Sequence, residues 1–264
     1  MVCSVLIPSF LATVAALAPA GFANGWQKLA NQPAANASTM FLLMDGRVLM
    51  NDWESTRWWL LTPDANGSYL NGTWSPTADS IDDRLYFASA VLANGRVIVS
   101  GGEYSNTGGF DKTEVYDPLK DKWTKRPTLT GWTYVGDAPS IVLADGRFMM
   151  GNIQDGETAI YDPSTSSWTA AATKLNGQCV EETWTLLPDG TFVTADCVNH
   201  PGSELYDPVA DAWVDLGNTP VDIVDSSLEV GAGLLMYDGR AFCLGATTHT
   251  LHYKPSTTPS GVGT

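Results

Sequence analysis

The stretch that decides the fold runs from Ser140 to Trp168 and has the sequence SIVLADGRFMMGNIQDGETAIYDPSTSSW. Two apolar runs flank the dipeptide Asp145-Gly146. This dipeptide tolerates the positive φ angles of a type I′ turn, so the pattern predicts a tight β-hairpin. Tyr161-Asp162-Pro163 then predicts the end of a third strand, because proline cannot continue the ladder. Trp168 opens a fourth apolar segment, and the whole stretch predicts a four-stranded antiparallel sheet.

The same landmarks recur along the chain. The hairpin dipeptide returns at spacings of 49, 51, 44 and 49 residues, at Asp45-Gly46, Asn94-Gly95, Asp145-Gly146, Asp189-Gly190 and Asp238-Gly239. The third-strand landmark is found at Tyr116, Tyr161 and Tyr206, with weaker copies at Leu61-Thr62-Pro63 and Tyr253-Lys254-Pro255. The fourth-strand tryptophan is found at Trp74, Trp123, Trp168 and Trp213. A repeat of this length and strand order is typical of a propeller blade, and the fifth copy lacks its tryptophan.

This pattern resembles the kelch repeat, in which a double glycine follows the hairpin; Gly101-Gly102 is the full copy here. The likeness is greatest to exported bacterial kelch-repeat proteins, which share the propeller type of the galactose oxidase central domain. The resemblance implies an all-β, kelch-type β-propeller over residues 21–264. Its units are expected at about 37–84, 85–131, 132–176, 177–220 and 221–264.

The sequence does not decide between two ways in which the ring of blades could be completed. Trp26 lies in a segment, residues 24–30, that looks like an unpaired fourth strand. In kelch propellers a terminal strand commonly completes the last blade, so this segment could complete unit five and close a five-bladed ring. The alternative is a truncated six- or seven-bladed propeller, which the larger usual size of kelch rings favours.

The net charge and the N-terminal composition limit which partners and which cellular compartment are expected. The chain has 264 residues and a net charge of 14 − 29 = −15. Such acidity disfavours binding to nucleic acid or to anionic membranes. Residues 1–20 are apolar and end in Ala18-Pro19-Ala20, which predicts a signal peptide, although no Lys or Arg precedes the apolar run. We therefore expect a secreted, periplasmic or cell-surface protein without membrane insertion.

Carboxylates at matching positions of three successive units form the first candidate site. They lie seven to nine residues before the hairpin turn, where the innermost strand of a blade begins: Asp137, Glu181, Glu182 and Glu229. A group of carboxylates at the mouth of the central channel could hold a hard cation such as Ca²⁺. Units one and two carry Ala37 and Tyr86 at this position, so any ring of ligands is incomplete.

Aromatic residues and cysteines give two further expectations. Tyr86, Trp132 and Tyr134 fall in predicted loops or strand starts, where exposed rings could stack on a ligand; packing between blades is the alternative role. Cys179 and Cys197 flank one predicted hairpin and are the most plausible disulfide pair.

No motif indicates an enzyme. Copper chemistry of the galactose oxidase kind requires tyrosines and histidines together. The chain has three histidines, His200, His249 and His252, and the last two lie beside a predicted outer strand and not at the channel. No hydrolase or zinc-protease motif is found, and no cofactor is expected apart from the possible calcium. We therefore predict a secreted binding or interaction module for a glycan or a protein. The alternatives are the propeller portion of a carbohydrate oxidase whose catalytic residues are not in this chain, and a purely structural repeat domain.

Overall fold

The computed structural model describes residues 25–256. The predicted signal peptide, residues 1–20, lies outside this range and stays a prediction. Residues 25–256 fold into strands, turns and loops, with no helix among them. No membrane-spanning helix is therefore found in the described part of the chain.

The strands form five antiparallel sheets, one for each predicted unit. Blade 1 contains β1 (Ala37–Leu42), β2 (Val48–Asp52), β3 (Trp58–Thr62) and β4 (Thr73–Pro76). Blade 2 contains β5 (Ala88–Val91), β6 (Val97–Ser100), β7 (Thr113–Asp117) and β8 (Lys122–Arg126). Blade 3 contains β9 (Ser140–Val142), β10 (Phe148–Gly151), β11 (Thr158–Asp162) and β12 (Ser167–Ala171). Blade 4 contains β13 (Thr185–Leu186), β14 (Phe192–Ala195), β15 (Gly202–Asp207) and β16 (Ala212–Asn218). Blade 5 contains β17 (Val230–Leu235), β18 (Ala241–Gly245) and β19 (Thr250–Tyr253).

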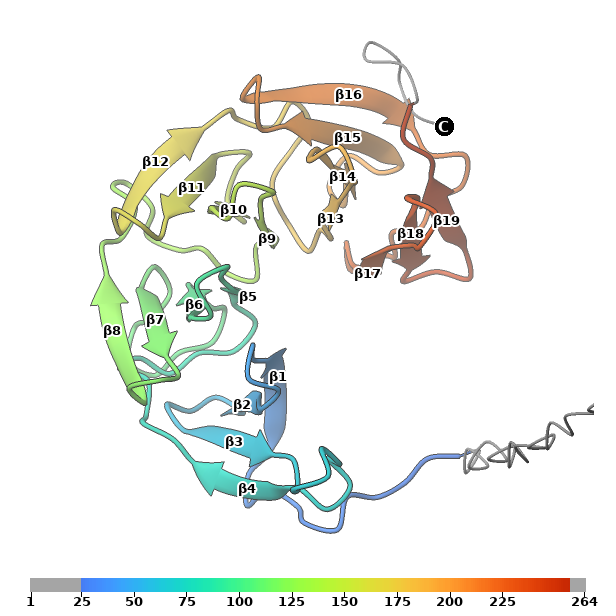
Figure 1. Cartoon of the computed structure of the whole chain (residues 1–264). Helices are drawn as coiled ribbons and strands as arrows, with labels where there is room; N and C mark the ends of the chain where they lie inside the picture. The colour runs from blue at the N-terminus through green and yellow to red at the C-terminus, as the bar shows by residue number, and fades with distance from the viewer. Residues whose placement is uncertain (1–24, 257–264) are drawn as a thin grey trace, which may run out of the picture.

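The five blades follow one another along an open arc, with the first strand of each at the inner side (Figure 1). This confirms the predicted β-propeller architecture and the incomplete fifth blade, which has three strands. The arc leaves a wide space between blade 5 and blade 1 (Figure 1). Residues 25–30, predicted to form a closing strand, make no strand in the structure, and the Trp26 side chain is fully exposed.

The hairpins form where the sequence predicts them, but with another turn geometry. The Gly46 N–H donates to Leu43 O, and the Leu43 N–H donates to Arg47 O, which closes a three-residue loop. Gly46 has φ 83°, whereas Asp45 has no positive φ, so the type I′ prediction was wrong. The Asp45 side chain explains the difference, because its Oδ1 accepts the Arg47 N–H at 3.1 Å and so stabilises a type I turn followed by a left-handed glycine. The other four hairpins repeat these bonds.

Successive blades are joined by a repeated contact of the fourth-strand tryptophan. Trp123 of blade 2 packs among buried side chains of blade 1, and its Nε1 donates to Ala78 O at 3.0 Å in the linker between the two blades. Asp121 Oδ1 accepts both the Tyr116 hydroxyl and the Ala78 N–H. Blade 4 repeats the whole arrangement with Trp213, Tyr206, Asp211 and Ala172.

Blade 3 shows why the aspartate is present in the other two contacts. Trp168 Nε1 donates to Pro127 O at 2.9 Å. Pro127 has no N–H to donate. The position of Asp121 and Asp211 is here occupied by Ser166, which keeps the same left-handed backbone with φ 58°. The aspartate is therefore needed only where a linker N–H requires an acceptor.

Candidate functional site

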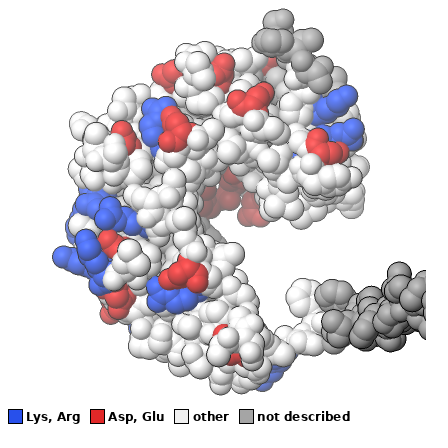
Figure 2. All heavy atoms as spheres, in the orientation of Figure 1, with Lys and Arg blue, Asp and Glu red and all other residues white. Residues whose placement is uncertain are grey.

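The candidate site lies at one mouth of the central channel, where loops from successive blades converge. In each blade the start of the first strand and the end of the second strand lie at the same edge, because the two strands are antiparallel. Asp137, Glu181 and Glu229 precede β9, β13 and β17, and Glu103 follows β6. These four residues are called the mouth carboxylates below. Figure 2 shows a group of acidic side chains on the inner side of the arc.

The mouth carboxylates interact strongly enough to retain a proton. Burial, a hydrogen bond to Asp137 and the negative charges of Asp137, Glu229 and Glu103 raise the pKa of Glu181 to about 8. Burial and the charge of Asp137 also raise the pKa of Glu103. Because its pKa is raised, Glu181 holds its proton at neutral pH more often than an ordinary glutamate does, which relieves part of the repulsion. No Lys or Arg is among the causes of these two shifts.

The structure does not test whether the mouth binds a metal ion. Three of the four predicted ligands share the mouth, and Glu103 joins them. Among the residues that the structure describes, however, no three His, Cys, Asp or Glu side chains are arranged to hold a metal ion. Calcium binding therefore stays a prediction.

Glu182 is not at the mouth, and its placement there was wrong. It is buried beside Lys174, which binds its carboxylate through a short ion pair. Its second oxygen accepts bonds from Trp184 Nε1 at 3.1 Å and Thr194 Oγ1 at 3.3 Å. The buried ammonium of Lys174 is the physical reason for this placement, since a buried carboxylate requires a partner.

Lys174 is the centre of a buried ionic cluster in blade 4. Its Nζ lies 3.3 Å from Glu204 Oε2 and 3.8 Å from Asp196 Oδ1, besides the contact with Glu182, and the side chains of all four residues are fully buried. Glu204 Oε1 also accepts the N–H groups of Leu175 and Asn176. The cluster thus fixes the segment that enters the inner strand of blade 4. The four residues Lys174, Glu182, Asp196 and Glu204 are called the Lys174 cluster below.

A row of exposed aromatic rings lies beside the mouth carboxylates. Trp53 and Tyr86 meet edge to face with centroids 5.9 Å apart, and Tyr86 meets Tyr104 in the same way at 6.0 Å. All three side chains are more than two-fifths exposed. The charges of Glu103 and Asp137 raise the pKa of Tyr104, which places the row next to the carboxylates. Tyr86, predicted to bind ligand, is therefore the centre of an exposed aromatic surface.

The other two aromatic predictions have different outcomes. Trp132 is buried in the core between blades 2 and 3, where its Nε1 donates to Glu157 Oε2 at 2.8 Å, so its ligand-binding assignment was wrong. A large ring with a satisfied N–H is favoured in such an interface. Tyr134 is half-buried; it packs on Phe110, and its hydroxyl donates to Glu103 O at 3.3 Å. Tyr134 therefore supports the loop that carries Glu103.

Glu103 and Tyr104 were missed in the sequence. They directly follow Gly101-Gly102, the only full double glycine that follows a hairpin of the repeat, and this position was the available signal. Gly101 and Gly102 have φ 68° and 137°, and a Cβ on Gly101 would lie 2.4 Å from the Val135 side chain. The glycines let the chain turn sharply after β6 and bring Glu103 and Tyr104 to the mouth.

The cysteines and histidines do not belong to this site. Cys179 and Cys197 are buried and free, so the predicted disulfide is not formed in the structure. The two thiols face different carbonyls, Cys179 Sγ that of Glu157 and Cys197 Sγ that of Glu181. His200 pairs with the Asp222 carboxylate at 2.5 Å, and His249 contacts the Asp222 carbonyl.

Comparison with known proteins agrees with the repeat. The kelch motif model matches residues 84–130. A galactose oxidase of Gibberella zeae is 25% identical over 160 residues, covering 55% of this chain and 22% of the relative. F-box/kelch-repeat protein SKIP20 of Arabidopsis thaliana is 35% identical over 94 residues, covering 32% and 22%. The chain thus spans about a fifth of the length of these two relatives.

A solved structure of YjhT has the same fold. It superposes with a TM-score of 0.62 at 16% identity and covers 81% of this chain and 73% of that protein. Together with the observed blades, this shows that the chain has a β-propeller fold, and the matched motif identifies a kelch repeat in blade 2.

Proposed function

We propose that the chain is a protein-interaction module whose channel mouth binds a positively charged segment of a partner. The observation that carries this proposal is the juxtaposition of the mouth carboxylates with the exposed row Trp53, Tyr86 and Tyr104. Carboxylates attract Lys and Arg, and exposed tryptophan and tyrosine rings add cation–π contacts. Kelch propellers commonly serve as interaction modules, which supports a protein ligand.

The charges of the site favour a cationic ligand over a neutral one. Burial, a hydrogen bond to Asp137 and the negative charges of neighbouring carboxylates raise the pKa of Glu181 to about 8. An ammonium or guanidinium group bound at the mouth would offset that repulsion and allow Glu181 to ionise. Binding should therefore release a proton near neutral pH.

A peptide-binding experiment tests this proposal. The probe is a synthetic peptide of alternating Lys and Gly, with a Glu-Gly peptide of the same length for comparison, titrated calorimetrically at two salt concentrations. We expect binding of the Lys peptide alone, weakened by salt. The double variant Asp137→Asn/Glu229→Gln should weaken it at least about tenfold, the effect of losing roughly 1.4 kcal/mol.

The matched control removes the same formal charge elsewhere. Asp189 and Asp238 lie in exposed hairpin turns of blades 4 and 5, at the other end of the strands from the mouth. Asp189→Asn/Asp238→Asn should leave the affinity within about twofold, because exposed charges far from the ligand are screened. An equal loss in both double variants would show a diffuse charge effect and contradict the proposal.

A glycan ligand is the second candidate, and the exposed aromatic row favours it, since such rings also stack on sugars. A neutral hexasaccharide serves as its probe. A glycan ligand predicts that the hexasaccharide binds with an affinity that does not depend on salt. Tyr86→Ala should then abolish this binding, and Asp137→Asn/Glu229→Gln should leave it unchanged. This result would support the glycan and exclude the cationic segment. The oxidase alternative lacks this kind of support, because His200 and His249 lie at Asp222 and not beside the mouth tyrosines.

A further inference from the structure

The outer edge of blade 2 is basic, although the chain as a whole is acidic. Five of the 14 Lys and Arg residues lie between Lys112 and Arg126, against a net charge of −15 for the chain. Three of them, Lys122, Lys125 and Arg126, belong to the five-residue outer strand β8 and are called the β8 cations below. Figure 2 shows this group of basic side chains on the outer side of the arc, where β8 lies in Figure 1. Positive charge is thus concentrated at one place on the rim.

The outer strands of the other four-stranded blades carry no Lys or Arg. They are β4, β12 and β16, with the sequences TWSP, SWTAA and AWVDLGN. Each is an edge strand like β8, because each ends its sheet. Lysines on edge strands commonly prevent aggregation between sheets, but that need would apply to all four strands. The β8 cations therefore indicate a role that is specific to blade 2.

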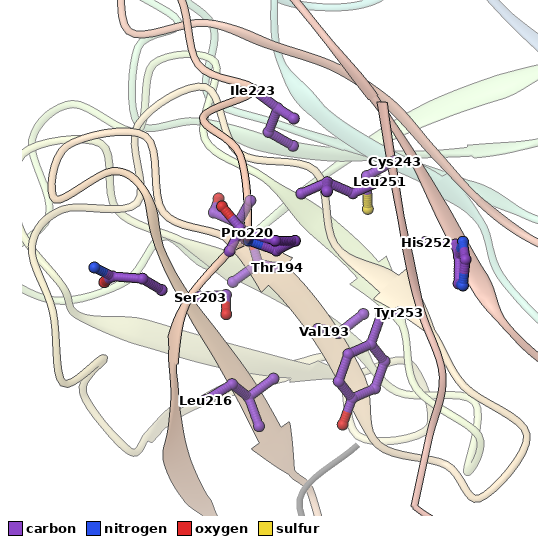
Figure 3. A pocket seen from close by; sticks show the side chains of 13 residues that line it. Val193, Thr194, Ser203, Leu216, Pro220, Ile223, Cys243, Leu251, His252 and Tyr253 are labelled. Atoms are coloured by element: carbon purple, nitrogen blue, oxygen red, sulfur yellow. The ribbon is translucent and has the colours of Figure 1, made fainter. Parts of the chain in front are cut away.

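The outer strand of blade 4 provides the internal comparison. Leu216 of β16 lines an apolar cavity of about 210 Å³ between blades 4 and 5, together with Leu251 and Tyr253 of β19 (Figure 3). Asp215 gives the same strand a negative charge. The edge of blade 4 therefore differs from that of blade 2 both in the sign of its charge and in its contact with a neighbouring blade.

The edge of β8 is available to a further strand. β8 pairs with β7 along its whole length, and the sheet of blade 2 ends at β8. Alternate residues of such a strand direct their N–H and C=O groups away from the sheet. Side chains alternate between the two faces. Trp123 packs toward blade 1, so Lys125 lies on that face, and Lys122 and Arg126 lie on the other.

The β8 cations have few counter-charges. Lys125 Nζ lies 3.4 Å from Asp82 Oδ2, and the Lys125 side chain is still 53% exposed. Lys122 is exposed and Arg126 is half-buried, and neither forms an ion pair with a described residue. One carboxylate thus partners three cations, and the edge is positively charged on both of its faces.

We propose that an extended acidic segment of a partner protein adds to the outer edge of blade 2 as a fifth strand, next to β8. In this mode of recognition, hydrogen bonds between main chains supply affinity and the alternating side chains supply specificity. Acidic side chains of the added strand oppose Lys122 and Arg126 on one face and Lys125 on the other. The site lies on the outer rim of the arc (Figure 1) and does not depend on the function proposed for the mouth.

A calorimetric titration of the full chain tests this proposal. The probe is a short capped peptide that repeats Glu-Glu-Val-Thr, and the comparison peptide has the same sequence with all of its backbone amides methylated. We expect the first peptide to bind, and salt to weaken the binding. The methylated peptide should bind at least about tenfold more weakly, because it cannot donate the hydrogen bonds of a strand. Lys122→Gln/Lys125→Gln should weaken binding of the first peptide by about fivefold or more, because two ion pairs are lost.

The matched control removes two positive charges elsewhere. Arg147 and Arg240 lie in the hairpin turns of blades 3 and 5, where each is paired with an aspartate of its own turn. Arg147→Gln/Arg240→Gln should leave the affinity within about twofold, because distant exposed charges are screened. The mouth variant Asp137→Asn/Glu229→Gln should also leave it within about twofold, so that a failure of this proposal can be told from a failure of the mouth proposal.

Four results would overturn the proposal. The acidic peptide does not bind, or the methylated peptide binds equally well, which would show attraction of charge without an added strand. Equal losses in Lys122→Gln/Lys125→Gln and Arg147→Gln/Arg240→Gln would show a diffuse charge effect. A dimer of the chain alone that is lost in Lys122→Gln/Lys125→Gln, measured by analytical ultracentrifugation, would show that a second copy and not a partner protein occupies the edge.

Discussion

Two neighbouring glutamates, Glu181 and Glu182, belong to acidic groups of opposite character. Glu182 is part of the Lys174 cluster, where a buried ammonium contacts three carboxylates and offsets part of their negative charge. Glu181 belongs to the mouth carboxylates, which are at least partly exposed, and in which burial and the charge of Asp137 raise the pKa of Glu181 and of Glu103. A compensated, buried cluster stabilises one conformation, whereas an uncompensated group at an open mouth is available to a cationic ligand. The difference teaches that acidic residues in a propeller have to be judged by their counter-charge rather than by their spacing.

The largest expected effect comes from removing the cation of the Lys174 cluster. Lys174→Met leaves three carboxylates buried without a counter-charge, so the free energy of unfolding at pH 7 should fall by about 3–5 kcal/mol. Acidification should recover part of this loss, because the pKa of Glu182, already raised to about 7 chiefly by burial, rises further without Lys174. Denaturant titrations at pH 7 and pH 5 measure both effects.

The control for this substitution is Lys120, whose ammonium is exposed and lies 3.7 Å from Asp117. Lys120→Met should change the free energy of unfolding by about 0.5 kcal/mol or less. A Lys174→Met variant as stable as Lys120→Met would show that the Lys174 cluster adds no stability, and the contrast with the mouth carboxylates would be lost.

The second prediction compares a buried ring with an exposed one. Trp132→Ala removes a core side chain and its bond to Glu157, so it should cost about 3–5 kcal/mol of stability. Tyr86→Ala removes an exposed ring and should cost about 0.5 kcal/mol or less, while it weakens ligand binding at the mouth. Chemical denaturation combined with the peptide titration separates the two roles. If the Trp132→Ala protein is still folded and binds the ligand more weakly, Trp132 would have to be assigned to the binding site after all.

The sequence predicts the blades well because their determinants are local. The hairpin dipeptides, the Tyr-Asp-Pro landmarks and the fourth-strand tryptophans act within one blade and its neighbour, and the structure contains each of them at the expected strand. The mouth was harder to predict, because contacts that are distant in sequence decide which of two adjacent acidic residues in a loop is buried. The spacing could not tell Glu181 from Glu182, and it gave no sign that Lys174 would pair with Glu182. Trp132 lies in a loop, as the sequence predicts, but its burial was missed, since its partner Glu157 is 25 residues away.

The smallest expected effect is the pH dependence of the mouth itself. Glu181 has a folded-state pKa of about 8, above its ordinary value of 4.5, so the folded state binds more protons than the unfolded state between these two values. Stability from this group is therefore fully present below about pH 4.5 and declines as the pH rises to about 8.

Glu181→Gln, which cannot ionise, should flatten that decline and raise the Tm at pH 9 by a few degrees, on the order of 2 °C for a domain of this size. Tm profiles from pH 5 to pH 9 for the wild type and Glu181→Gln measure this, with Glu54→Gln, an exposed glutamate, as the control. Parallel profiles for all three proteins would mean that Glu181 ionises at its ordinary pKa, and the mouth would then differ from the Lys174 cluster in exposure alone.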